Sequence, residues 1–251
     1  MTRQRTDDLG GQVVPGRRAV LELLQAGRRG VRSISVTAGR DPAPILDDIR
    51  ERAAAAGIPV RHRDPDALRE EAGVEAAQGV VARADAIPSA PLGPLLDDAH
   101  AFLVALDGVT DPRNLGAVLR SAVAAGATGA LVPRHRSALL SPAAVKAAAG
   151  AVEHLPIALV GGVPAALDQA SRAGVWSVGL DAAGDRDVYD VPIADRPLVL
   201  VLGAEGAGLA RLVRERCEVV VRVPMPGPME SLNVAAAAAV ACFEVARQRA
   251  G

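Results

Sequence analysis

The feature that most constrains the fold is a series of continuous apolar segments after residue 100, each joined to the next by a helical pattern. These segments are "AFLVALDGV", "GALVP", "IALV", "WSVGLD", "PLVLVLG" and "VVVRVPM". Strands that are apolar on both faces are typical of a parallel sheet covered by helices on both sides. We therefore predict an α/β domain with a mostly parallel sheet over residues 101–251, and one continuous helix over residues 142–155. Ligands of such sheets bind at the loops beyond the carboxyl ends of the strands.

A smaller α/β unit is predicted before this domain. Strand patterns in "SISV", "IPVRH" and "QGVVARAD" alternate with helical patterns in "GRRAVLELLQAG", "APILDDIRERAAAAG" and "PDALREEAG". Four prolines in "AIPSAPLGPLLDDAH" mark a boundary. A chain of 251 residues is long enough for two modest domains. We expect a flexible tail over residues 1–11, a small domain over 12–86, a linker over 87–100 and the larger domain over 101–251.

Charge and composition narrow the classes of partner. The net charge of -1 gives no global basic field, but residues 1–40 contain eight arginines against three acidic residues. This excess could bind phosphates, or it could belong to a solvated N-terminus. Aromatic residues make up only 2% of the chain, which argues against recognition by base stacking. No apolar run has the length of a membrane span, so we expect a cytoplasmic protein that has no membrane partner.

The two cysteines, Cys217 and Cys242, fit no metal-ligand spacing. An isolated pair of this kind is typical of a reducing compartment. We therefore expect no metal site.

The loop and helix in "TDPRNLGAVLRSA" carry the first candidate site residues. Asp111 suits an N-cap, and a helix that begins after it places Arg113 and Arg120 on one face, seven residues apart. Gly116 lies between the two arginines and could leave a notch in which a phosphate or a carboxylate reaches both. The alternative is a surface helix with two solvated arginines. Asn114 could orient a neighbouring side chain or simply cap the helix.

Two further loops follow apolar strands. In "LVLVLGAEGAGL" the glycines form G-x-x-G-x-G, which is not the dinucleotide-binding pattern G-x-G-x-x-G, so it is weak evidence for NAD. Glu205 in this loop could accept a hydrogen bond or balance an arginine, or it could be an ordinary soluble carboxylate. In "VPMPGPMESLNVAAAAAVACFEVARQR", Ser231 and Asn233 place a hydroxyl and an amide at the start of a helix, where capping is the simpler explanation. That helix is apolar all round, which predicts burial in the core or against a partner chain.

Taken together, "DPRNLGAVLRSA", "LVLGAEGAGL" and "VRVPMPGPMESLNVAAAAAVACFEVARQR" resemble the SpoU (TrmH) family of S-adenosylmethionine-dependent RNA 2'-O-ribose methyltransferases, in the SPOUT superfamily. The smaller unit is similar, through "PGRRAVLELL" and "AAQGVVAR", to the L30e-like substrate-binding domain of members that methylate a guanosine of 23S rRNA. It departs from the family pattern at Ala77, where those members have histidine. The resemblance implies a C-terminal trefoil knot, an exception to the rule against threaded chains, and a homodimer packed partly through the last helix.

The resemblance also implies the site residues. It assigns the catalytic set to Asn114, Arg120, Glu205, Ser231 and Asn233. It places S-adenosylmethionine against Leu202, Gly203, Val223, Met225 and Leu232. Together with the local charge, it makes Arg17, Arg18 and Arg113 the candidate substrate-binding residues.

The mechanism that follows is an in-line transfer of a methyl group to a ribose hydroxyl, without a metal. A guanidinium is always protonated near neutral pH, so Arg120 suits a phosphate or alkoxide clamp better than a general base. Three alternatives remain at this stage. They are the same chemistry on tRNA in place of rRNA, an RNA-binding module of the same fold without catalysis, and a Rossmann oxidoreductase, which the missing G-x-G-x-x-G disfavours.

Overall fold

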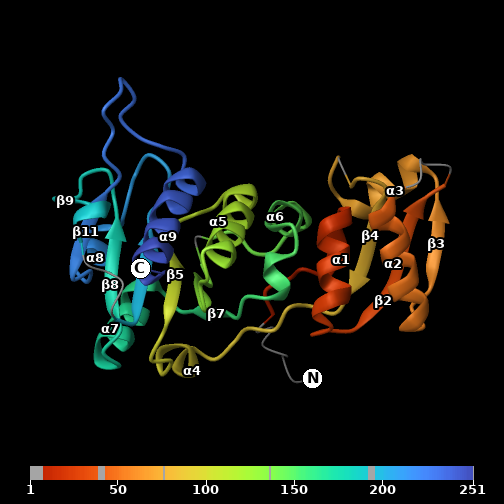
Figure 1. The fold of residues 1–251 in the computed structure, drawn as a ribbon, viewed down its shortest axis with the longest axis horizontal. Coiled ribbons are helices and arrows are strands. Elements are labelled where there is room, and N and C mark those ends of the chain that lie inside the picture. The colour runs from red at the N-terminus through yellow and green to blue at the C-terminus, as the bar shows by residue number, and fades with distance from the viewer. Residues whose placement is uncertain (1–7, 39–42, 76, 136, 192–195, 251) are drawn as a thin grey trace. The chain divides into compact units, whose positions relative to one another are not determined.

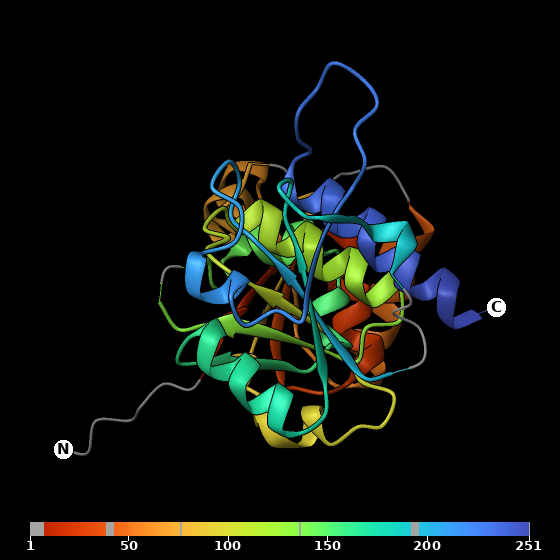
Figure 2. The same ribbon diagram turned by 90° about the vertical axis from the view of Figure 1, so that its left-hand side faces the viewer.

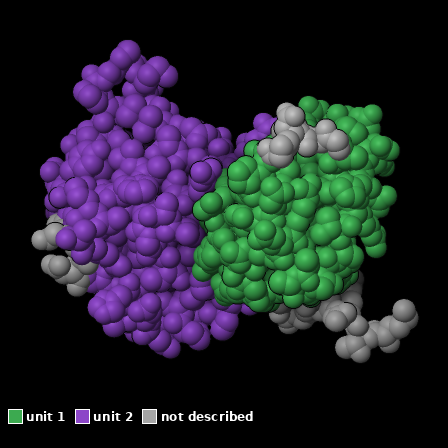
Figure 3. Space-filling view, turned by 45° about the vertical axis from the view of Figure 1, so that its right-hand side comes forward, with its two compact units in different colours: residues 1–88, 139–154 green, residues 89–138, 155–251 purple. Residues whose placement is uncertain are grey.

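The computed structural model describes residues 8–38, 43–75, 77–135, 137–191 and 196–250. The chain divides into two compact units (Figure 3). Unit 1 contains Met1–Pro88 and Leu139–His154, and unit 2 contains Ser89–Ala138 and Leu155–Gly251. None of the described helices is long and apolar enough to cross a membrane.

Unit 1 is built on a four-stranded sheet in the order β1-β4-β2-β3 (Figure 1). The pairs β1–β4 and β4–β2 are antiparallel, and β2–β3 is parallel. The strands are β1 (Val13–Pro15), β2 (Val31–Thr37), β3 (Val60–Arg63) and β4 (Val80–Ala84). The helices are α1 (Arg17–Ala26), α2 (Pro44–Ala55), α3 (Pro65–Ala72) and α6 (Pro142–Ala148), with a 3-10 turn η1 (Ala151–Glu153). The three strands and three helices that the sequence predicted before residue 87 are present.

Ala77, the residue at which this sequence departs from the family histidine, lies in the interior of this unit. Ala77 is buried in a small core with Leu68, Ala72 and Val81, under α3. Its methyl group fills apolar space, and the polar function that a histidine would bring is absent from this position.

The predicted helix over residues 142–155 is wrong in its second half. The helix α6 ends at Ala148, and Ala149 and Gly150 then have φ angles of 49° and 97°. A side chain at Gly150 would lie 2.4 Å from Cβ of Glu22, so the turn needs glycine where it meets α1. Residues Leu139–His154 belong to unit 1, although the sequence pattern placed them inside the larger domain.

The expected tail and linker also differ from the structure. Residues 1–7 lie outside the described residues, but Leu9 is only 1% exposed and its N–H donates to the carbonyl of Ile87, with an N–O distance of 2.9 Å. The part of the tail from Asp8 onward is therefore packed. The linker contains the short helix α4 (Leu92–Leu96), and Leu96 is buried in the core of unit 2.

Unit 2 is built on a seven-stranded sheet in the order β7-β6-β5-β10-β8-β11-β9, and every ladder in it is parallel. This confirms the predicted parallel sheet. The strands are β5 (Phe102–Leu106), β6 (Gly129–Pro133), β7 (Ile157–Val160), β8 (Trp176–Leu180), β9 (Arg186–Asp187), β10 (Leu198–Leu202) and β11 (Val219–Arg222). The helices are α5 (Pro112–Ala124), α7 (Val163–Arg172), α8 (Arg211–Arg214) and α9 (Val234–Ala250), with a 3-10 turn η2 (Val188–Asp190).

Helices cover both faces of this sheet, as its continuous apolar strands require. The helices α4, α7 and α8 pack on one face, where Leu103, Leu131 and Val201 form part of the core. Figure 2 shows α5 and α9 side by side on the other face. The blue loop between β11 and α9 extends away from the sheet in both ribbon views (Figures 1 and 2).

Candidate active site

The loops that follow the carboxyl ends of β8, β10 and β11 enclose a cavity of about 960 Å³, here called the carboxyl-edge cavity. A site at this edge of the sheet is what a parallel fold predicts. All five residues expected to hold the cofactor line the cavity, namely Leu202, Gly203, Val223, Met225 and Leu232. Glu205 and Ser231 line it as well. Two of the three loops that the sequence singled out, those after β10 and β11, therefore line one concave surface together with the loop after β8, which the sequence did not single out.

The loop of residues 203–209, here called the Glu205 loop, has a fixed backbone. Ala204 and Gly208 exchange two backbone hydrogen bonds, each with an N–O distance of 3.0 Å. A Cβ atom at Gly203 would lie 2.3 Å from the carbonyl carbon of Gly208, so only glycine permits this approach. The two glycines shape a tight turn, and Glu205 lies exposed at its tip.

Three of the five expected catalytic side chains form one hydrogen-bonded network. Asn114 donates through Nδ2 to Oε1 of Glu205 at 2.8 Å. Asn233 donates through Nδ2 to the same carboxylate oxygen and to Oδ1 of Asn114, the latter at 3.2 Å. The network joins the first turn of α5, the Glu205 loop and the start of α9, which are far apart in the sequence.

Asn233 performs capping as well. Its Oδ1 accepts a hydrogen bond from the backbone N–H of Ala235 at 2.8 Å, which satisfies an orphan donor at the start of α9. The capping explanation for Asn233 is therefore confirmed, and the other end of the same amide enters the network. Ser231 lines the cavity, and its hydroxyl makes no hydrogen bond with any described residue.

Arg113 and Arg120 are exposed on α5, and neither guanidinium has a partner among the described residues. Asp111 caps the helix, since Oδ1 accepts from the N–H of Arg113 at 2.8 Å. The predicted notch at Gly116 is wrong, because Gly116 is buried on the face of α5 that packs inward. Arg120 is also not among the residues that line the carboxyl-edge cavity.

Arg17 and Arg18 lie at the start of α1 in unit 1, and both have internal partners. The Nε of Arg17 donates to the carbonyl of Gln78 at 3.0 Å. Arg18 pairs with Glu22 at 2.8 Å while its side chain stays 66% exposed. The structure therefore gives both arginines a local role, and Arg18 keeps most of its surface free.

Two aspartates at this edge were not predicted from the sequence. Asp107 follows β5, and its Oδ2 accepts from the N–H of Ala210 at 2.8 Å. Asp181 follows β8, lines the carboxyl-edge cavity, and its Oδ2 accepts from the N–H of Leu209 at 2.9 Å. The signal was present as an aspartate directly after an apolar strand in "LVALD" and in "SVGLD".

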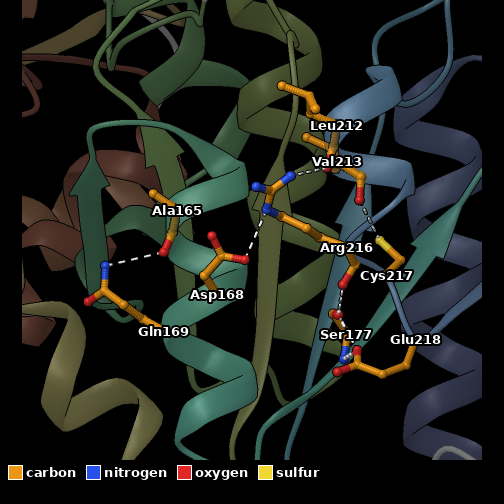
Figure 4. A network of polar contacts seen from close by, with 9 residues as sticks. All are labelled: Ala165, Asp168, Gln169, Ser177, Leu212, Val213, Arg216, Cys217 and Glu218. Carbon is orange, nitrogen blue, oxygen red and sulfur yellow. Dashed lines mark hydrogen bonds and ion pairs between the residues drawn. The ribbon is translucent and has the colours of Figure 1, made fainter.

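The segment that follows the Glu205 loop is anchored by a second polar network (Figure 4). Arg216 donates through Nε to Oδ1 of Asp168 on α7 at 2.9 Å. Ser177 at the start of β8 donates from its N–H to Oε2 of Glu218 at 2.6 Å. These contacts hold α8 against α7 and β8, on the face of the sheet opposite α5 and α9.

The cysteines are unsuited to nucleophilic chemistry. Burial raises the pKa of Cys217 to about 12, with a further contribution from Glu218, and burial alone raises the pKa of Cys242 to about 12. Both therefore stay protonated at neutral pH. No cluster of His, Cys, Asp or Glu among the described residues could hold a metal ion.

Comparisons with known proteins agree with this arrangement. Residues 101–243 match the model of the SpoU rRNA Methylase family, and residues 13–90 match a domain described as RNA 2'-O ribose methyltransferase substrate binding. A 23S rRNA (guanosine-2'-O-)-methyltransferase RlmB of Pseudomonas putida is 40% identical over 244 residues, covering 93% of this chain and 95% of the relative. An uncharacterized tRNA/rRNA methyltransferase of Mycobacterium ulcerans is 41% identical over 251 residues, covering 98% and 80%.

Solved structures show the same fold. The SpoU methyltransferase AviRb from Streptomyces viridochromogenes, in complex with the cofactor AdoMet, aligns with a TM-score of 0.77 and 29% identity, over 95% of this chain and 90% of that chain. The AdoMet-bound rRNA methyltransferase from Sinorhizobium meliloti aligns with a TM-score of 0.76 and 27% identity, over 94% and 86%. These matches confirm the resemblance inferred from the three motifs. The chain belongs to the SpoU rRNA methylase family.

Proposed function

We propose that this enzyme transfers a methyl group from S-adenosylmethionine to the ribose 2'-hydroxyl of a guanosine in 23S rRNA, in the cytoplasm. The observation that carries the proposal is the network of Asn114, Glu205 and Asn233 beside the carboxyl-edge cavity. A polar constellation built from three distant segments, next to a cavity of ligand size, is typical of an active site. The guanosine target comes from relatives named for it, at about 40% identity.

The cavity suits S-adenosylmethionine. Its volume of about 960 Å³ lies within the range of small-molecule sites, and Leu202, Val223, Met225 and Leu232 give it apolar walls. Gly203 lines the cavity, and its missing side chain lets the backbone of Gly208 pack against it, which shapes this part of the wall. When bound, S-adenosylmethionine supplies a methyl group activated by its sulfonium charge. The remaining task of the chain is to hold the ribose hydroxyl in line with that methyl group.

The network residues orient one another for this task. Glu205 accepts from two amides at once, so Asn114 and Asn233 keep fixed directions without reorganisation during the reaction. Ser231 has a free hydroxyl on the cavity wall that can contact the ribose. Arg120 is exposed and unpaired among the described residues, so its guanidinium is available for the phosphate of the target nucleotide and for the developing alkoxide.

We assign RNA contacts to arginines of unit 1 and, separately, to an arginine on α5 of unit 2. Residues 13–90 match a substrate-binding domain by its family description, and Arg18 presents a largely exposed side chain there. Arg17 and Arg113 are the further candidates for phosphate contacts, with Arg113 exposed in the first turn of α5.

We also propose that two copies of the chain associate through α9. One face of this helix is buried through Ala238, Ala241 and Val245, but Phe243 on the other side is 52% exposed. An exposed phenylalanine among small residues is suited to packing against a second copy of the chain. The trefoil knot that the resemblance implies remains a prediction about the path of the chain through these loops.

One experiment tests the reaction and its target together. Two reactions contain the purified enzyme and methyl-labelled cofactor, one with 23S rRNA and one with tRNA. Both RNAs come from cells that lack the enzyme, and the 2'-O-methyl sites are then mapped. Label on one 23S guanosine supports the proposal. Label on tRNA alone would identify tRNA as the substrate in place of 23S rRNA. RNA binding without label would identify a non-catalytic module.

A further inference from the structure

The position of Glu205 depends on what holds its loop in place. The loop projects beyond the end of β10, and its two internal hydrogen bonds between Ala204 and Gly208 fix its shape. They do not fix its orientation on the sheet. That orientation decides whether Glu205 meets Asn114 and Asn233, because both lie on other elements.

Asp181 connects the end of this loop to the loop after β8, while Asp107 accepts from the N–H of Ala210, the residue that follows the Glu205 loop. The carboxylate of Asp181 accepts from the N–H of Leu209 at 2.9 Å through Oδ2, and from the N–H of Ala183 at 2.8 Å through Oδ1. One side chain therefore holds the end of the Glu205 loop and the loop after β8, and residues of both loops line the carboxyl-edge cavity. Gly208 is shaped to this contact, since a Cβ atom there would lie 2.5 Å from Oδ2 of Asp181.

Both oxygens of this carboxylate have partners within the protein. Its side chain is only 11% exposed, and Nη1 of Arg214 lies 3.4 Å from Oδ1. Arg214 also donates through Nη2 to the carbonyl of Ala183 at 2.7 Å. Two backbone donors and a guanidinium occupy the oxygens, so the negative charge is compensated and held within the wall.

We propose that Asp181 is a positioning residue for methyl transfer, which aligns the Glu205 loop with the loop of residues 181–184 and thereby forms two walls of the cofactor cavity. The inference rests on the proposed function. Leu209 also packs in the core of unit 2, so the test separates the positioning role from a general role in stability by measuring cofactor affinity and local exchange in both loops.

The test compares the wild-type enzyme with Asp181→Asn and with Asp168→Asn. The first change keeps the shape but turns an NH2 group toward a backbone donor, so at least one of the two amide bonds is lost. The second removes a carboxylate from another arginine pair of unit 2, away from the cavity. Calorimetry gives the affinity for S-adenosylmethionine, steady-state assays give kcat and KM, and hydrogen exchange reports on residues 181–184 and 203–210.

We expect Asp181→Asn to weaken cofactor affinity by about tenfold or more, since a hydrogen bond to a charged group is lost. Exchange should become faster in both loops, and Asp168→Asn should leave affinity and exchange in these loops unchanged. Gly208→Ala, which pushes on the same carboxylate from the other side, should act in the same direction. Unchanged affinity and unchanged exchange in Asp181→Asn would overturn the proposal, as would an equal effect of Asp168→Asn.

The same measurements separate this inference from the proposed function. A wild-type enzyme that binds no S-adenosylmethionine contradicts the function, and the exchange data then still decide whether Asp181 holds the two loops. Normal binding by the wild type together with normal binding and exchange in Asp181→Asn contradicts only the positioning role.

Discussion

At the scale of single residues, the candidate active site contains amides whose oxygen and nitrogen bind different partners. Asn233 uses its oxygen for the N–H of Ala235 and its nitrogen for Glu205 and Asn114. Glu205 accepts both amides through one oxygen. Replacing any one of the three leaves a donor or an acceptor of the others without its partner, and such a loss costs more than the bond itself contributes.

Asn233→Asp separates the two functions of this side chain. An aspartate can still accept from Ala235 and cap α9, but it cannot donate to Glu205, and it places a like charge beside that carboxylate. We expect the contribution of the cap to the melting temperature to be kept and most methyl transfer to be lost. Asn233→Ala should lower both, with about 0.5–2 kcal/mol of stability lost with the cap. Normal turnover in Asn233→Asp would show that this residue caps α9 and has no part in methyl transfer.

Glu205→Gln tests whether this residue acts through its shape or through its charge. A glutamine oxygen can accept from Asn114 and Asn233 as the carboxylate does, so the network should persist. We expect Glu205→Gln to retain most of the turnover, and Glu205→Ala to lose about tenfold or more because two amides lose their acceptor. Equal loss in both variants would show that the negative charge itself is required. Steady-state kinetics with saturating cofactor distinguish the outcomes.

Arg120→Ala should lower turnover by about 100-fold or more and leave the affinity for S-adenosylmethionine nearly unchanged. The reason is that Arg120 lies outside the cavity lining, and its guanidinium, on the exposed face of α5, pairs with no side chain in the part of the chain that the structure describes. Arg120→Lys is the matched control, because it keeps the charge and removes the planar fork. Turnover of Arg120→Ala near the wild-type rate would rule out the clamp.

At the scale of elements, α9 has one face in the core and one face in solvent. The sequence predicted burial of this helix, since alanine, valine and phenylalanine occur all round it. The structure shows burial of Val234, Ala238, Ala241 and Val245 against the rest of unit 2, while Phe243 is exposed. The helix therefore has an apolar surface that the single chain does not cover.

Phe243→Glu tests the proposed homodimer. A charge in the middle of an apolar contact should shift the protein to a monomer, because burying a carboxylate there costs free energy. Sedimentation equilibrium should give two copies for the wild type and one for the variant. Leu212→Glu is a control, since Leu212 is 47% exposed on α8, on the other face of the sheet. A wild-type monomer, or a dimer that Phe243→Glu does not change, would contradict this interface.

At the scale of the whole molecule, the sequence predicted what periodicity and strand composition can encode. The parallel sheet followed from segments such as "LVLVL", which is buried at every position of β10. The packing of residues Leu139–His154 with unit 1 did not follow, because it depends on a turn at Gly150 that fits against Glu22. The role proposed for Asp181 was also missed, because an aspartate after an apolar strand, as in "SVGLD", does not indicate which backbone amides it binds.

The response of stability to pH is a property of the molecule as a whole, and the two buried thiols contribute to it in alkaline solution. Folding raises the pKa of Cys217 and of Cys242 from 9.0 to about 12. Between these values the unfolded chain has lost a proton that the folded protein keeps, so unfolding releases protons and the free energy of unfolding falls as pH rises. Below about pH 9 both states hold the proton, and the thiols cause no dependence on pH.

Chemical denaturation at a series of pH values from 8 to 11 measures this effect. Each thiol should contribute a slope of up to about 1.4 kcal/mol per pH unit above its unfolded pKa. Cys242→Ala removes one titrating group, so the variant should lose stability less steeply than the wild type, although it starts lower because a buried sulfur is replaced by a smaller group. Only the difference between the two slopes belongs to Cys242, since other residues titrate in both proteins. Parallel curves would mean that the folded protein ionises this thiol as readily as the unfolded chain does.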